Sequence, residues 1–461
     1  MSKHNKQSSM AGKSVTGPTF EPNAAGIDIG AREIFVAVPA DRDPRPVRKF
    51  GTFTEDLRHM AEWLVQCGVR TVAMESTGVY WIPVYDMAEQ HGVTPCLVNP
   101  RNMKNVPGKR TDFHECQWIQ YLHSMGLLHS AFRPDGNVCA VRSLMRHRSD
   151  LVEMASQHVQ HLQKALTQMN VQIHHVISDL TGLTGLAILD AIVAGERDVA
   201  VLARLRDPRI KASEETIRKS LEGNWRPEHL LALKQRLRLY RAHLEEISEC
   251  DREIEKLVAA FEPFVDPDDK PLPPDRKQKQ RRRKKKGANP DFNMRLEAYK
   301  LFGVDLTQIP GLMMLAMMLF SEVGRDMSRW PTAAHFVSWL GLCPDNDISG
   351  GKVLWRGVRR TKNRAGTLFR LAAHSLHHDQ TPLGDYLRRM KAKLGPAAAT
   401  TATAHKIAII FYTMVKNQVE YDESLWAERD ALRQQRIETR LHKQAAKHGY
   451  KLVPLEETQA A

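Results

Sequence analysis

Apolar residues recur every three or four positions over four heptads near the middle of the chain, and this spacing restricts the segment to one long helix. The positions are Leu230, Leu233, Leu237, Tyr240, Leu244, Ile247, Asp251, Ile254 and Val258, with Asp251 the one polar residue among them. A stripe of this kind needs a partner helix to cover it. It fits an antiparallel hairpin or an intermolecular coiled coil, and equally the core of an ordinary helical bundle.

A second helical run precedes the first. Its apolar positions alternate steps of three and four residues: Val159, Leu162, Leu166, Met169, Ile173 and Val176. The sequence TGLTGLAILDAIVAGERD, between the two runs, indicates a shorter helical connection. We therefore predict an α-helical, coiled-coil middle domain over residues 133–265.

Residues 23–132 show a different pattern, in which strands and helices alternate. The runs AAGIDIG and EIFVAVPA flank a Gly-containing turn, which predicts a β-hairpin. LRHMAEWLVQCG has helical spacing and ends at Gly68, while TVAMES and TPCLVNP predict short buried strands. This order predicts an α/β domain with helices packed on a sheet.

Residues 293–425 form a third block, mostly α-helical and interrupted by Pro and Gly. Ile309, Pro310 and Gly311 predict a turn that opens an apolar helix, as in helix–hairpin–helix elements. Residues 426–461 are expected to form a charged C-terminal helix and tail, to which we assign no chemistry, and residues 1–22 a disordered tail.

The net charge of +14 at pH 7 suggests a polyanionic partner, most simply nucleic acid. Nine of the positive charges lie in residues 276–286, inside the Pro-, Gly- and Asp-rich segment 266–292. Such a composition predicts a basic flexible linker, either lying along phosphates or simply solvated.

Composition excludes several other classes of protein. The chain is 42% hydrophobic and 26% charged, as in ordinary globular proteins, and its longest apolar stretch is about ten residues, too short to span a membrane. The six cysteines lie far apart without a CxxC pair, which argues against a disulfide scaffold or a zinc ribbon. We therefore expect a cytoplasmic protein.

Four carboxylates occupy positions typical of a metal site. Asp28 lies between two isoleucines on a predicted strand, so it faces away from them, and Glu75 ends another strand. Asp112 and Glu115 are three residues apart and share one face if that segment is helical. Such a set can hold the divalent ions of a phosphoryl-transfer site, although each acid could instead cap a turn or pair with an arginine.

Ser349 precedes two glycines, where another molecule can approach the backbone closely. Basic residues without an acid among them follow it: Lys352, Arg356, Arg359, Arg360, Lys362, Arg364 and Arg370. An exposed serine beside cations can attack a phosphate, and the cations are predicted to bind nucleic acid. A plain Ser-Gly-Gly turn is the alternative, and no hydrolase triad accompanies it.

These segments together resemble the bridge-RNA-guided insertion-sequence recombinases, the transposase family that also includes the Piv/MooV-type DNA invertases. The resemblance covers roughly residues 23–453 and rests on these segments: GIDIG, AMESTGVYW, VNPRNMKNVPGKRTDFHECQW, GERD, GNWRPEH, IPGLMMLAMMLFSEVG, GLCPDNDISGGKVLWRG, NRAGTLFRLAAHSL and TATAHKIA. It implies a RuvC-like, RNase H-like N-terminal domain at residues 23–132 and a transposase domain at residues 293–425.

Carried over residue by residue, the resemblance implies an acidic tetrad of Asp28, Glu75, Asp112 and Glu115 that holds Mg²⁺ or Mn²⁺, and a nucleophile at Ser349. The chain departs from the family pattern at Glu115, where that pattern usually has Asp, and this puts the role of the fourth ligand in doubt. The basic insertion 276–286 is also unusual for the family and receives no role.

The implied activity is excision and insertion of a mobile element. A structured bridge RNA would pair with donor and target DNA, while Ser349 would form a covalent phosphoserine that a 3′-hydroxyl then attacks, with the metal ions activating the serine. A homo-oligomer, a dimer or tetramer, is expected in a bacterial, nucleoid-associated setting, with the heptad helices as a hypothetical assembly surface.

Two other readings remain open at this point. In the first, the chain is a metal-dependent nuclease or resolvase of the RuvC kind, and Ser349 is structural. In the second, it binds nucleic acid without catalysis, a possibility that Glu115 supports. Covalent capture of DNA by Ser349 separates the recombinase from both.

Overall fold

The computed structural model describes residues 21–76, 78–99, 112–274, 290–313, 315–355, 357–358 and 363–451. The chain divides into two compact units, which meet in sequence at Arg133 and Pro134. Each unit is treated separately below. Among the described residues, no helix combines the length and apolar character needed to cross a bilayer.

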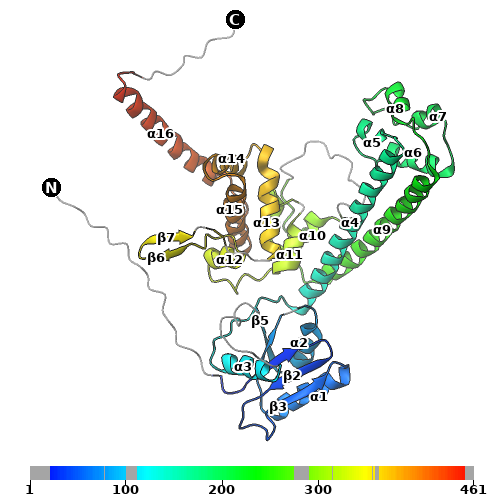
Figure 1. Cartoon of the computed structure of the whole chain (residues 1–461). Coiled ribbons are helices and arrows are strands. Elements are labelled where there is room, and N and C mark those ends of the chain that lie inside the picture. The colour runs from blue at the N-terminus through cyan, green and yellow to red at the C-terminus, as the bar shows by residue number, and fades with distance from the viewer. Residues whose placement is uncertain are drawn as a thin grey trace. The chain divides into compact units, whose positions relative to one another are not determined.

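The N-terminal unit is built on a five-stranded mixed sheet (Figure 1). Its strands are β1 (Ala24–Ile29), β2 (Glu33–Ala37), β3 (Val47–Gly51), β4 (Thr71–Glu75) and β5 (Thr94–Val98), in the spatial order β3-β2-β1-β4-β5. Strand β2 runs antiparallel to β1 and β3, whereas β1, β4 and β5 are parallel. The predicted hairpin and the two predicted buried strands are therefore confirmed. Strand β3 was not predicted, because its sequence VRKFG is polar and lies at an edge of the sheet.

Helices cover both faces of this sheet. Helix α1 (Thr54–Gln66) is the predicted helix before Gly68, and it packs with α2 (Trp81–Gln90) on one face, around Ile27, Leu64 and Met74. Helix α3 (Asp112–Ser124) packs on the other face, around Ala73, Val98 and Ile119. Since side chains alternate along each strand, neighbouring strand residues contribute to opposite cores.

The C-terminal unit contains a long antiparallel helical hairpin. Helices α4 (Gly136–Gln168) and α9 (Pro227–Ala259) each span 33 residues and pack along one another. Seven of the nine heptad positions are buried: Leu233, Leu237, Tyr240, Ile247, Asp251, Ile254 and Val258. The antiparallel-hairpin alternative is thus confirmed. Helix α4 of the same chain covers this stripe. The hypothesis that the two helices form an assembly surface stays a prediction.

The polar position in the stripe is paired inside the hairpin. The Asp251 carboxylate accepts a hydrogen bond from Arg148 Nε at 2.5 Å and one from the backbone N–H of Asp291 at 3.2 Å. Both side chains of the ion pair are buried, at 8% and 2% exposure. A buried charge needs such partners, because desolvation otherwise makes it very costly.

A small helical group lies at the end of the hairpin away from its base (Figure 1). It consists of α5 (Ile173–Val176), α6 (Leu183–Ala194), α7 (Val199–Arg204) and α8 (Glu214–Ser220). Its core joins both long helices, through Leu166 of α4 and Leu233 of α9, to Ile188 and Leu202. The helical connection predicted between the two runs corresponds to α6.

The remaining residues of this unit form a helical body that also contains a two-stranded sheet. The elements are α10 (Met294–Phe302), η2 (Leu306–Gln308), α11 (Ala316–Val323), α12 (Ala333–Trp339), β6 (Asp347–Ser349), β7 (Lys352–Trp355), α13 (Arg364–His374), η3 (Ser375–His378), α14 (Pro382–Leu394), α15 (Pro396–Asn417) and α16 (Ser424–Lys447). Phe302, Phe320, Phe336, Phe369 and Phe411 are fully buried at its centre. The expectation of a mostly helical block is confirmed, with one β-hairpin added to it.

Part of the predicted flexible linker is anchored to this body. Tyr299 donates to the carbonyl of Lys270 at 3.2 Å, and Arg295 donates to the carbonyl of Pro273 at 2.6 Å. Residues 266–274 therefore differ from a free linker, because α10 supplies donors for their backbone. The basic stretch 276–286 lies outside the described residues, as do residues 1–20 of the predicted N-terminal tail.

Candidate functional site

Two predicted acids lie at the same level on neighbouring strands. The β1–β4 register pairs Ile27 with Met74, so Asp28 and Glu75 come one step further along the two parallel strands. Ile27 and Met74 belong to the core under α1 and α2. Because side chains alternate, Asp28 and Glu75 lie on the opposite face, which α3 covers.

A close approach of helix to sheet places α3 beside these strands. A Cβ atom on Gly26 would clash with the backbone of Gln120 and Cys116, so only glycine fits at this position. Gly26 precedes Asp28 by two residues and faces the same way. Glu115, next to Cys116, is thereby brought to the strand that carries Asp28.

Asp28 and Glu115 line one open cleft of about 510 Å³, together with Ile29, Gly30, Arg32, Glu33 and Phe35. Asp112 is the first residue of α3, and its side chain lies outside the described part of the chain. Among the described side chains, no group of three or more metal-ligating residues is close enough to share an ion.

Glu33 and Arg32 are charged residues of this cleft that sequence reasoning missed. Glu33 begins β2, and the backbone N–H of Gly30 donates to its carbonyl at 2.9 Å, which closes the β1–β2 turn. Its carboxylate accepts a hydrogen bond from Lys49 of β3 at 2.9 Å. The predicted hairpin already implied that both residues lie next to the end of β1, so the signal was present.

Ser349 is the last residue of β6 and lies at the tip of the β6–β7 hairpin. The loop is Gly350-Gly351, with φ of +54° and +77°, the positive values that a two-residue hairpin loop requires at both positions. Ser349 is exposed, and its hydroxyl has no hydrogen-bond partner within the described residues. The hairpin itself was not predicted, although a Gly-Gly pair between β-forming residues is a known signal for one.

Lys352 is the direct cross-strand partner of Ser349. Opposed residues of an antiparallel pair share a face, with Cβ atoms roughly 5 Å apart, so the ammonium group can reach an anion bound at the serine. Lys352 is exposed, as are the apolar side chains of Ile348 (63%), Leu354 (70%) and Trp355 (46%) around it.

The other predicted nucleic-acid-binding residues differ in their surroundings. Arg356, Arg359, Arg360 and Lys362 lie outside the described residues. Arg364 is exposed on the first turn of α13. Arg370 donates to the carbonyl of Gly341 at 2.8 Å, and burial lowers the pKa of its guanidinium, so in this structure it contributes to the fold.

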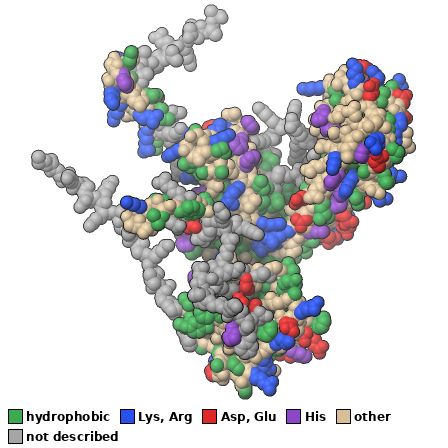
Figure 2. Space-filling model, in the orientation of Figure 1, with side chains coloured by type: hydrophobic (Ala, Val, Ile, Leu, Met, Phe, Trp, Pro, Cys, Tyr) green, Lys and Arg blue, Asp and Glu red, His purple; other side chains and the backbone are tan. Residues whose placement is uncertain are grey.

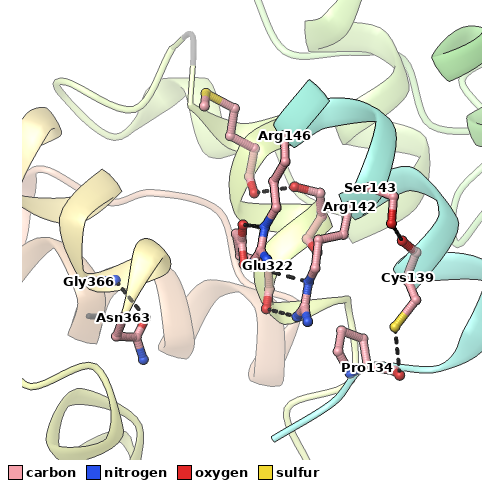
Figure 3. Close-up of polar contacts among 10 residues, drawn as sticks. Pro134, Cys139, Arg142, Ser143, Arg146, Glu322, Asn363 and Gly366 are labelled. Carbon is pink, nitrogen blue, oxygen red and sulfur yellow. Dashed lines mark hydrogen bonds and ion pairs between the residues drawn. The ribbon is translucent and has the colours of Figure 1, made fainter. Parts of the chain in front are cut away.

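A polar network holds the helix that carries Arg364 (Figure 3). Asn363 Oδ1 accepts from the backbone N–H of Gly366 at 3.0 Å, and its Nδ2 donates to the carbonyl of Trp339 at 3.1 Å. These bonds cap α13 and tie its start to the end of α12.

The base of the helical hairpin is joined to α11 in the same region (Figure 3). Arg146 binds the Glu322 carboxylate in a bidentate manner, with distances of 2.9 and 2.7 Å. Arg142 donates to the carbonyls of Ser321 and Glu322 at 3.0 and 2.8 Å, at the C-terminal end of α11, where cations are favoured. A cavity of about 230 Å³ is lined by Arg146, Glu322 and Arg364, among others.

Two family models match the chain. A DEDD-type model of the IS110 group, described as Transposase, matches residues 25–171, from β1 through α4. A second model, described as Transposase IS116/IS110/IS902 family, matches residues 305–387, from η2 into α14, and so includes the β6–β7 hairpin. A search of curated proteins finds no match.

The matches give the class of the protein: it is an enzyme, a DNA transposase or recombinase. More narrowly, they support an IS110/IS116 transposase, the enzyme of an insertion sequence. Its substrate is accordingly DNA.

Proposed function

We propose that this transposase is an RNA-guided recombinase that exchanges donor and target DNA strands through a covalent phosphoserine at Ser349. In this proposal the N-terminal unit is an RNase H-like domain of the RuvC kind, and residues 293–425 form the domain of the nucleophile. The sheet order β3-β2-β1-β4-β5 supports the first part, with its acids on parallel neighbours at one end of the strands.

The acids are proposed to bind a divalent cation, Mg²⁺ or Mn²⁺. The chemistry of the donors suits such an ion, because every proposed ligand atom is a carboxylate oxygen. Asp28 and Glu115 line one cleft, and Glu75 ends the strand beside Asp28. Asp112 completes the proposed set from the first turn of α3. The ion would supply positive charge next to the scissile phosphate. The chain's own part is to hold these carboxylates in place from three elements.

Ser349 is the proposed nucleophile. Its Oγ loses a proton and bonds to phosphorus, while the bond from phosphorus to the 3′-oxygen breaks and leaves a free 3′-hydroxyl. In the second step a 3′-hydroxyl of the other DNA attacks the same phosphorus and Ser349 regains its proton. The ammonium group of Lys352 is placed to offset the charge that develops on the phosphate.

RNA guidance is the proposed source of sequence specificity. The cations near Ser349 suit phosphate contacts, which position nucleic acid without reading its sequence. Base pairing with a structured RNA would then select the donor and target, as in other RNA-guided systems. The enzyme would act as a homo-oligomer on DNA of the bacterial nucleoid.

The observation that carries the nucleophile assignment is the environment of Ser349. The residue is exposed at the tip of a hairpin, opposite a lysine, and within the described residues its hydroxyl has no hydrogen bond to make it structural.

A denaturing gel tests this assignment. Protein incubated with labelled DNA, guide RNA and Mg²⁺ should retain label in the wild type and lose it in Ser349→Ala. Ser338→Ala is the matched control, since Ser338 is an exposed serine of the same unit, and it should retain label. Cleavage that persists in Ser349→Ala would instead favour the metal-dependent nuclease.

A second comparison tests guidance. The RNA transcribed from DNA flanking the gene should be required for strand exchange, and changing its pairing loops should redirect the product. Strand exchange that proceeds unchanged without RNA would remove this part of the proposal while leaving the phosphoserine intact.

A further inference from the structure

Helix α16 (Ser424–Lys447) carries a row of basic residues on one side. Arg436, Arg440, Lys443 and Lys447 are separated by four, three and four positions. At 3.6 residues per turn, this spacing confines them to about 60° of the helix circumference. All four side chains are exposed, and we name this set the basic stripe. Figure 2 shows blue Lys and Arg side chains along the helix.

The sequence continues the same spacing toward the start of the helix. Arg433 precedes Arg436 by three positions, and Arg429 precedes Arg433 by four. With these two positions the row extends over about 27 Å at 1.5 Å per residue. The acidic residues of the helix, Glu428, Asp430 and Glu438, do not occur at positions of the row.

Within the described chain, no acidic side chain offsets the positive charge of the basic stripe. None of its four residues forms an ion pair there, and no described side chain of α16 is buried. Like charges three and four positions apart on a helix repel each other and destabilise it. The row therefore destabilises α16 as an isolated helix. Binding a polyanion along the row would remove this repulsion.

The charge and shape of the stripe favour nucleic acid over a membrane surface. The sides away from the stripe mix Leu441 and Ala445 with Glu438 and His442, whereas an interfacial helix needs a broad apolar face. A duplex carries about one negative charge per 1.7 Å of axis, so a straight row of cations can follow its backbone. The enzyme's class already makes nucleic acid its substrate.

We infer that α16 binds the sugar–phosphate backbone of a DNA duplex, the substrate of the enzyme's class, through the basic stripe. This contact lies outside both matched segments, residues 25–171 and 305–387, and does not depend on which residue is the nucleophile. It adds affinity without sequence preference, because phosphates carry no sequence information.

The test measures the salt dependence of binding to a 30-base-pair duplex of arbitrary sequence. The variant Arg436→Gln, Arg440→Gln, Lys443→Gln and Lys447→Gln removes four positive charges from the stripe. For DNA, the slope of log binding constant against log salt should become shallower by about 3 to 4, since each lost phosphate contact contributes about 0.9. The single variant Arg440→Gln should lower it by about 0.9.

The chain offers a matched control on another side of the same helix. Gln435, Leu441, His442 and Ala445 are not three or four positions from any stripe residue, so acids placed there do not pair with the stripe. Replacing all four by Glu changes the net charge by nearly the same amount. The slope should stay much closer to that of the wild type. Circular dichroism shows whether α16 remains helical in both variants.

Separate arms with DNA and RNA duplexes identify the nucleic acid. A shallower slope in the DNA arm, confined to the stripe variants, supports the inference. Equal effects of the stripe and control variants would overturn it, as would an unchanged slope with DNA or an effect confined to the RNA duplex. It would also be overturned if the stripe variants lost only binding to phosphatidylserine vesicles.

Discussion

Asp28, Glu75 and Glu115 lie on one side of the N-terminal sheet. The first two do so because residues two apart on a strand point the same way. Gly26 and Asp28 face α3 from β1, and Ala73 and Glu75 face it from β4. Because glycine has no Cβ, Gly26 lets α3 approach the sheet closely, and this approach brings Glu115 of α3 to the cleft. The geometry of the cleft thus depends on a glycine as much as on the acids.

The acid at position 115 gives a test at this scale. Glu115→Gln keeps size and removes charge, so DNA cleavage should fall by about 100-fold or more if the carboxylate stabilises charge at the reacting phosphate. Glu115→Asp should keep a substantial part of the activity, because the family pattern has Asp there. Initial rates of cleavage on labelled DNA measure both.

Glu33→Gln is the control for position 115. Glu33 lines the same cleft but is ion-paired with Lys49 and is not in the proposed ligand set. It should cost far less than Glu115→Gln. Equal losses for the two variants would mean that general negative charge in the cleft, and not a specific ligand, is what matters.

The acids on the strands could be predicted from the sequence because strand alternation is a local property. Asp28 between two isoleucines has to face away from them. The place of Glu33 in the cleft depends on how the chain turns after β1, and the role of Gly26 depends on contact with α3 more than 80 residues away. The predicted hairpin already indicated that Glu33 lies beside the end of β1, whereas the role of Gly26 does not follow from any local pattern.

At the scale of elements, the α4–α9 hairpin is held by apolar contacts and one buried ion pair. The sequence predicted the length and spacing of both helices. It could not choose between an intramolecular and an intermolecular partner, since the heptad pattern is the same in both cases. The partner of the polar position Asp251 is Arg148, 103 residues earlier in the chain, and only the folded structure shows that the two side chains pair.

Removing one partner of this pair should destabilise the hairpin strongly. Asp251→Ala removes the carboxylate that pairs with the buried Arg148 guanidinium, and we expect a loss of about 3–5 kcal/mol in the free energy of unfolding. Urea unfolding followed by circular dichroism measures it. The double variant Arg148→Met, Asp251→Leu should recover most of the loss, because apolar side chains fit a buried seam. No recovery would contradict this account.

The same hairpin should lose stability in mild acid. Burial, and then the neighbouring His243, Arg236 and His161, lower the pKa of His158 from its ordinary value, and its Nδ1 is buried without a hydrogen-bond partner among the described residues. The unfolded chain therefore binds this proton more readily than the folded one. Stability is fully present above the ordinary histidine pKa of about 6.5 and falls as pH drops toward the lowered folded value.

A comparison of urea midpoints at pH 7.5 and pH 5.5 tests this effect. The midpoint should drop less in His158→Gln than in the wild type, because glutamine does not titrate. His147→Gln is the control, since His147 is exposed on the same helix and is not one of the groups that act on His158. An equal drop in wild type and His158→Gln would show that other groups cause the acid sensitivity.

At the scale of the whole molecule, the chain carries its acids in one compact unit and Ser349 in the other. The order of these groups along the chain, together with the family matches, supports a transposase. The β6–β7 hairpin, like strand β3, was not predicted from the sequence pattern, because its strands are only three and four residues long. Short exposed strands bury no alternating face, so periodicity does not reveal them.

The most direct test of the central claim is the chemical state of Ser349 during strand exchange. Wild-type protein is mixed with donor DNA, guide RNA and Mg²⁺, quenched in denaturant, digested with nuclease and protease, and analysed by mass spectrometry. The account predicts a nucleotide joined through phosphate to the peptide that contains Ser349. Cleaved DNA with that peptide unmodified, or with the nucleotide on another residue, would contradict it.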